Sequence, residues 1–373
     1  MIYLDNAATT KPCKECVSAV TEAMENTFGN ASSLHAAGTA SLQIISRAKH
    51  TILGALSGKK TSLDGEMIFT SGATESNNTA LLGSAHRFAR GFDKGVKKIV
   101  TTAIEHPSVA KTLVRFEEDG FEIVRLAPKD SADFVEALIN AVDENTVLLS
   151  AMAVNNETGF AIDVPHLYKE VKRKNPKTIV HIDAVQGFLK MPLDGDLISV
   201  SGHKIHSTKG IGALYIKKGA NILPLLSGGG QQHNLRSGTE PVELIAGFEA
   251  AVKAYKGTHE HFSELKKYLL ERLSKMSDIS INSGDNCLPN IVNFSVRGVR
   301  SEIMLHSLEE DGIYVSSGSA CSKGKKSEVL AAFGVSDKDA DCAVRVSFCS
   351  ENTTDDIDAL CDKIEKTIER VRR

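Results

Sequence analysis

The stretch DLISVSGHKIHSTKGIGALYI, residues 196–216, decides the fold. Its apolar runs 197–200 and 213–216 predict two buried strands, and the polar run Ser201-Gly202-His203-Lys204 directly follows the first of them. Lysine is seldom buried without a purpose, and desolvation favours the neutral, nucleophilic form of its amine. Lys204 therefore indicates covalent chemistry at the end of a strand, with a solvated loop lysine as the alternative for this residue taken alone.

Short apolar runs alternate with longer amphipathic runs over residues 15–250, which predicts an α/β fold with a mainly parallel sheet and crossover helices. The expected strands are 67–70, 98–101, 147–151, 179–182, 197–200 and 213–216. Further along the chain, the pattern predicts helices at 263–276 and 354–371 and strands at 291–296 and 344–348. We therefore expect a large domain over 15–250 and a small α+β domain over 1–14 and 251–373.

Composition narrows the possible functions. The chain has 373 residues, 42% of them hydrophobic, and a formal net charge of −3, which gives no reason to expect binding to nucleic acid or to an acidic membrane. No signal peptide and no run of about 18 apolar residues is found, so we expect a soluble, cytoplasmic protein. The seven cysteines are odd in number and dispersed, which favours reduced thiols. Cys13 and Cys16 form a C-x-x-C without a second pair, so neither a metal site nor a redox role is expected.

Two more segments carry polar groups where strands end. In GEMIFTSGATESNNTALLG (65–83), Ser71-Gly72-Ala73-Thr74 lies between a predicted strand and a predicted helix, which is typical of an anion site, although an ordinary capped turn has the same pattern. In TIVHIDAVQG (178–187), the strand ends on Asp183, whose carboxylate needs a cation or a helix terminus as its partner. A strand-end aspartate, a strand-end lysine and a helix-end phosphate site together are the anchors of pyridoxal 5′-phosphate.

The sequence resembles the class V aminotransferase family and, within it, the NifS/IscS-like cysteine desulfurases. The resemblance runs nearly end to end through YLDNAATT (3–10), FGNASSLH (28–35), FTSGATESNN (69–78), EHPSV (105–109), VNNETG (154–159), HIDAVQ (181–186), SGHK (201–204), KGIGALY (209–215), GGGQQHNLRSGTE (228–240), PNIVNFS (289–295) and VSSGSACS (315–322). It implies the aspartate-aminotransferase-like fold of type I pyridoxal-phosphate enzymes.

The resemblance also implies roles for individual residues. The residues implied to contact the cofactor are Ala73, Thr74, His106, Asn156, Asp183, Gln186, Ser201, His203, Lys204 and Thr239. Lys204 would bind the cofactor covalently, Asp183 would pair with its ring nitrogen, and His106 would stack on the ring. Thr239 would reach the phosphate from the second subunit of a homodimer. Asn156 and Arg345 would orient the substrate L-cysteine, with the Arg345 guanidinium on its carboxylate.

Cys321 lies in VSSGSACSKGKKSEVL (315–330), where three lysines follow it closely. Nearby cations favour the thiolate, the form that attacks sulfur. The resemblance implies that Cys321 takes sulfur from L-cysteine as a persulfide, with Lys204 and His106 as the other catalytic residues. The alternative is an inert loop cysteine, and the other six cysteines are interpreted as structural or incidental.

The expected function is therefore that of a cysteine desulfurase, which hands its sulfur to an acceptor protein for iron–sulfur cluster assembly or tRNA thiolation. Another class V enzyme, such as a selenocysteine lyase or an aminotransferase, would share every cofactor residue. A non-enzymatic scaffold is disfavoured because Lys204, Asp183 and Cys321 are all intact. The segment after Cys321 is shorter than in housekeeping family members, which leaves the acceptor open.

Overall fold

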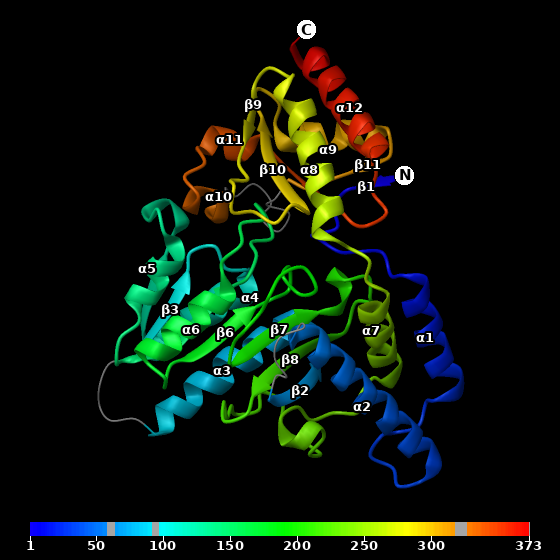
Figure 1. The fold of residues 1–373 in the computed structure, drawn as a ribbon, viewed down its shortest axis with the longest axis vertical. Helices are drawn as coiled ribbons and strands as arrows, with labels where there is room; N and C mark the ends of the chain where they lie inside the picture. The colour runs from blue at the N-terminus through cyan, green and yellow to red at the C-terminus, as the bar shows by residue number, and fades with distance from the viewer. Residues whose placement is uncertain (58–63, 92–96, 318–326, 373) are drawn as a thin grey trace.

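The computed structural model describes residues 1–57, 64–91, 97–317 and 327–372. Its main feature is a seven-stranded sheet in the order β2-β8-β7-β6-β5-β3-β4 (Figure 1). These strands are β2 Gly65–Thr70, β3 Lys98–Thr102, β4 Glu122–Leu126, β5 Thr146–Met152, β6 Ile179–Asp183, β7 Leu197–Ser201 and β8 Gly212–Lys217. β8 is antiparallel to both neighbours and the other pairs are parallel, so the expected mainly parallel sheet is confirmed.

Helices cover both faces of this sheet. They are α1 Lys14–Asn26, α2 Ala36–Ser57, α3 Ala73–Gly91, α4 Pro107–Glu118, α5 Phe134–Ala141, α6 Val164–Lys174 and α7 Val242–Ala254. Side chains of α2, α5, α6 and α7 share one apolar core with the sheet, while those of α3 and α4 share another with β3 and β5. The sheet is therefore buried on both sides, as its continuous apolar strands require.

A second, antiparallel sheet lies above the first in Figure 1, in the order β12-β10-β9. Its elements are β9 Ile279–Ile281, β10 Ile291–Val296, β12 Ala343–Ser347, α8 His259–Ser274, α9 Ser301–Glu310 and α12 Thr354–Arg372, with short helices α10 Glu328–Ala332 and α11 Asp337–Asp341. Residues of α8, α9 and α12 form a separate apolar core with β10 and β12. The domain boundary near residue 250 stays a prediction.

The first ten residues connect the two sheets. β1 (Ile2–Tyr3) pairs in parallel with β11 (Ile313–Tyr314). Farther along, the backbone N–H of Ala7 donates to the Ser347 hydroxyl at 2.8 Å, and the Thr10 hydroxyl donates to the His203 carbonyl at 3.0 Å. The segment therefore passes from the small sheet to the end of β7.

The described residues also test the expectations about membrane-spanning helices and reduced cysteines. No helix among them is long and apolar enough to cross a membrane. The six described cysteines form no disulfide, and burial raises the pKa of each thiol, as expected for reduced, structural cysteines. They are Cys13, Cys16, Cys287, Cys342, Cys349 and Cys361.

His181 in the middle of β6 is fully buried between two serine hydroxyls. Its Nδ1 lies 2.8 Å from Ser150 Oγ on β5, and its Nε2 lies 3.0 Å from Ser199 Oγ on β7. Burial lowers the pKa of His181 to about 3, so the imidazole is neutral in the folded protein at neutral pH. This neutral bridge joins three neighbouring strands below the site.

We therefore expect acid to weaken the fold through His181. Below pH about 6.5 the unfolded histidine binds a proton that the folded one refuses, so stability falls as the pH drops towards 3, by up to about 1.4 kcal/mol per pH unit. Urea unfolding of wild type and His181→Gln between pH 4.5 and 7.5 measures this, because the difference between the two proteins removes the contribution of other groups. If the free energies of unfolding of the two proteins changed in parallel with pH, the low pKa assigned to His181 would be wrong.

Candidate active site

The polar residues predicted at strand ends do gather at one edge of the large sheet. β6 ends on Asp183 and β7 ends on Ser201, and the 3-10 turn η2 (Gly202–Lys204) follows directly. Because β6 and β7 are parallel neighbours, their carboxyl ends lie at the same edge. The carboxylate and the amine therefore come from adjacent strands.

The amine of Lys204 is held by the N-terminal segment. Its Nζ donates to the carbonyls of Ala7 and Ala8, each at 2.6 Å. The buried amide of Gln186 donates to the same Ala7 carbonyl at 2.9 Å. One backbone oxygen therefore aligns two of the residues implied to contact the cofactor.

Asp183 is 4% exposed, and its side chain accepts hydrogen bonds from two donors. Asn77 Nδ2 donates to its Oδ2 at 2.8 Å, and the backbone N–H of Val185 donates to its Oδ1 at 3.1 Å. Asn77 Nδ2 also lies 2.9 Å from Ser108 Oγ, which in turn lies 2.8 Å from His106 Nδ1. A hydrogen-bonded chain thus links Asp183 to His106.

His106 caps α4, because its Nδ1 accepts from the backbone N–H of Ser108 at 3.1 Å. Burial lowers the pKa of His106, the charge of Asp183 opposes this, and the charge of Lys204 adds to it. The imidazole is therefore neutral at neutral pH and can accept a proton.

The predicted anion site lies at the start of α3. Gly72 has a φ of +151° and a Cβ there would meet open space, so the backbone before Ala73 and Thr74 is accessible. Ser201 is 2% exposed, and its hydroxyl finds no hydrogen-bond partner within the described residues. Burial lowers the pKa of nearby His203 to about 4, and its Nδ1 lies 3.2 Å from the Thr9 hydroxyl. These groups can take up a phosphate by hydrogen bonding.

Arg345 on β12 brings the small sheet to the site. Its side chain is almost fully buried, with Nη1 donating to the Asn156 carbonyl at 2.8 Å and Nη2 donating to Asp5 Oδ1 at 2.7 Å. The Nε group has no partner among the described residues. The guanidinium is thus fixed beside Asn156, the other residue implied to orient the substrate.

Two predicted site residues are not placed with the others. Thr239 is exposed, in the segment after the 3-10 turn η3 (Gln232–Asn234). Cys321 lies outside the described residues, within 318–326. Their roles stay predictions.

Sequence reasoning missed three polar residues of the site: Asn77, Glu105 and Glu157. Glu105 is 5% exposed, and its Oε1 accepts from the Thr102 hydroxyl at 2.6 Å and from the Met152 N–H at 2.8 Å. Burial raises the pKa of Glu105 to about 8 and that of Glu157 to about 7. The nearby charge of Asp183 also raises the pKa of Glu105. The signal that could have found them is a charged or amide side chain inside the quoted motifs EHPSV, VNNETG and FTSGATESNN.

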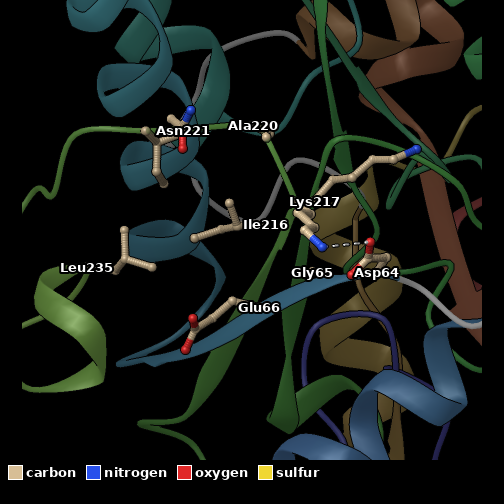
Figure 2. A pocket seen from close by; sticks show the side chains of 11 residues that line it. Asp64, Gly65, Glu66, Ile216, Lys217, Ala220, Asn221 and Leu235 are labelled. Carbon is tan, nitrogen blue, oxygen red and sulfur yellow. Dashed lines mark ion pairs between the residues drawn. The ribbon is translucent and has the colours of Figure 1, made fainter.

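The structure has a large cavity away from the predicted site residues and a very small one beside Lys204. One of about 380 Å³ opens beside Asp64, Glu66 and Leu235, and none of the predicted site residues lines it (Figure 2). A second, with room for about one water molecule, borders Gln186 and Lys204. Over the described residues, no group of three His, Cys, Asp or Glu side chains is arranged to hold a metal ion.

Comparison with known proteins assigns the chain to a family. The family model for aminotransferase class V matches residues 2–360. Cysteine desulfurase IscS of Dictyoglomus turgidum is 38% identical over 386 residues, covering 100% of this chain and 95% of the relative. Cysteine desulfurase IscS of Methanosarcina thermophila is 36% identical over 385 residues, covering 100% and 93%.

Solved structures agree. One described as a NifS-like protein superposes with a TM-score of 0.88 at 32% identity, covering 99% of both chains. Another, SspA in complex with cysteine, gives a TM-score of 0.81 at 30% identity and covers 95% of this chain and 100% of that one. The chain belongs to the class V aminotransferase family, among relatives named NifS and IscS.

Proposed function

We propose that this protein is a pyridoxal-phosphate-dependent cysteine desulfurase, which converts L-cysteine to L-alanine and transfers the sulfur to Cys321 as a persulfide. The observation that carries the proposal is the placement of Asp183 and Lys204 at the ends of adjacent strands, together with a buried Ser201 hydroxyl that has no hydrogen-bond partner among the described residues. The names of the relatives supply the reaction.

The residues fit pyridoxal phosphate. Asp183, held by two hydrogen-bond donors, suits the protonated ring nitrogen, and Lys204 suits the aldehyde carbon. The accessible backbone of Gly72 to Thr74, together with the hydroxyl of Ser201, suits the phosphate. When bound, the cofactor withdraws electrons from the substrate Cα and so makes its proton acidic.

The remaining steps belong to side chains of this chain. Arg345 and Asn156 bind the α-carboxylate of L-cysteine and orient Cα towards Lys204. The Lys204 amine removes the Cα proton, and neutral His106 assists proton transfer at the substrate sulfur. The Cys321 thiolate attacks that sulfur, the Cβ–S bond breaks, a proton takes its place on Cβ, and a persulfide remains on Cys321 as L-alanine leaves.

The working form is proposed to be a homodimer, with Thr239 completing the phosphate site of the second copy. Exposed apolar side chains support a partner surface: Met24 is 63%, Phe28 80% and Leu34 102% exposed, all on or between α1 and α2. The persulfide is proposed to pass to an acceptor protein that serves iron–sulfur cluster assembly or tRNA thiolation.

Lys204 should carry the cofactor. We expect the purified protein to be yellow and borohydride to fix a pyridoxyl group on Lys204, because Lys204 and Asp183 lie at the ends of adjacent strands. Peptide mapping by mass spectrometry checks this, with Lys190 as an internal comparison because it borders the same small cavity. A label on Lys190, or on no lysine, would overturn the assignment.

Cys321→Ala separates the two halves of the reaction. It should keep the yellow colour and the absorbance change on adding L-cysteine, since the thiol acts after substrate binding, yet sulfide release should fall by at least about 100-fold. Sulfide and alanine are assayed with L-cysteine, and Cys342→Ala serves as the matched control, at a half-buried thiol that does not line the small cavity beside Lys204. Undiminished alanine formation by Cys321→Ala would favour the lyase or aminotransferase alternatives.

Assembly gives a further test. If Thr239 completes the neighbour's phosphate site, Thr239→Ala should weaken cofactor binding by roughly tenfold, about one hydrogen bond to an ionised group, without separating the dimer. Sedimentation combined with cofactor titration measures both properties. A fully active monomer would refute the shared site.

A further inference from the structure

Ser327, the first described residue after 318–326, is tied to the connection between β5 and α6. Its hydroxyl donates to Glu157 Oε2 at 2.7 Å. Ser327 Oγ also accepts from the backbone N–H of Leu330 at 3.1 Å, so Ser327 caps α10. Glu157 is 9% exposed, which shields this contact from water.

The backbone that carries Glu157 is itself firmly held. Asn155 Oδ1 accepts from the N–H groups of Glu157 and Thr158, at 3.0 and 2.9 Å. Asn155 Nδ2 donates to the Ile104 carbonyl at 3.1 Å, and Asn293 Nδ2 donates to the Glu157 carbonyl at 3.1 Å. Residues from both sheets therefore fix the position of Glu157.

The chain before residue 318 is anchored to the same place. Ser316 exchanges two backbone hydrogen bonds with Arg345, at 3.2 and 2.7 Å. Arg345 in turn donates to the carbonyl of Asn156, the residue next to Glu157. The described residues on both sides of 318–326 thus lead to Asn156 and Glu157.

We propose that Glu157 is a positioning residue for sulfur transfer: its hydrogen bond to Ser327 fixes where the segment that carries Cys321 rejoins the fold, relative to Asn156 and Arg345. This inference rests on the proposed function of Cys321. Ser327 follows Cys321 by only six positions in the sequence, so a fixed Ser327 limits where the thiolate can meet the substrate sulfur. Glu157 acts without contacting the substrate, and any acceptor oxygen at its position can serve.

The test is a double-mutant cycle on the rate of persulfide formation by the cofactor-loaded enzyme in a single turnover. Glu157→Ala and Ser327→Ala should each lower this rate by about fivefold to tenfold, which corresponds to the loss of one hydrogen bond. Because both variants remove the same contact, the double variant should be no slower than either single variant. Glu157→Gln keeps an acceptor oxygen and Ser327→Thr keeps the hydroxyl, so both should stay within about twofold of wild type. Ser327→Asp retains the helix cap but at pH about 8.5, where Glu157 is ionised, it repels Glu157 and should be as slow as Ser327→Ala.

A second measurement does not depend on catalysis. The rate at which iodoacetamide alkylates Cys321, followed by mass spectrometry, should change in the two alanine variants and in Ser327→Asp, but not in Glu157→Gln or Ser327→Thr. The inference would be overturned if the alanine variants formed the persulfide at the wild-type rate. It would also be overturned if the rate of the double variant fell by the product of the two single effects. Absence of persulfide in the wild type would instead refute the proposed function, while the alkylation rates would still show whether the contact positions Cys321.

Discussion

The parallel pairing of β6 with β7 is the constraint on which the site depends. In this pairing His181 lies opposite Leu197 and Asp183 lies opposite Ser199, so β6 ends on Asp183 while β7 continues to Ser201, where the lysine turn follows at once. Side chains alternate between the faces of a sheet, and a slip by one residue would send Asp183 to the opposite face. The serine–histidine–serine bridge below the site fixes the same register from inside the sheet.

The site also contains several buried ionisable groups, among them Asp183, Glu105 and Arg345. Asp183 and Glu105 each accept from two donors. Burial nevertheless raises the pKa of Glu105 to about 8, so at neutral pH the Glu105 side chain is mainly protonated. Arg345 lies at the opposite boundary, where Asp5 balances its charge. Environment, rather than residue type, gives these carboxyl groups different states.

Much of this could be read from the sequence because parallel strands are buried on both faces and appear as plain apolar runs. β10 was predicted at its exact bounds, and the six expected strands of the large sheet all lie within observed ones. β4 was missed because it is a half-exposed edge strand, and α8 begins at His259, earlier than expected, because Thr258 caps it. Asp183 and Lys204 were predicted because they end apolar runs, whereas the motifs that contain Asn77 and Glu105 do not specify their distant partners, Asp183 and the Met152 N–H.

The long reach of the first ten residues has a consequence for how the molecule is made. Ala7 is anchored by Ser347, 340 positions away, and only in that place do its carbonyl and that of Ala8 hold the Lys204 amine. On the ribosome, β6 and β7 can pair long before Ser347 has been synthesised, so the large sheet can form around an unfinished lysine site. The lysine site is therefore completed only when segment 1–10 docks against Ser347, which is synthesised long after β6 and β7.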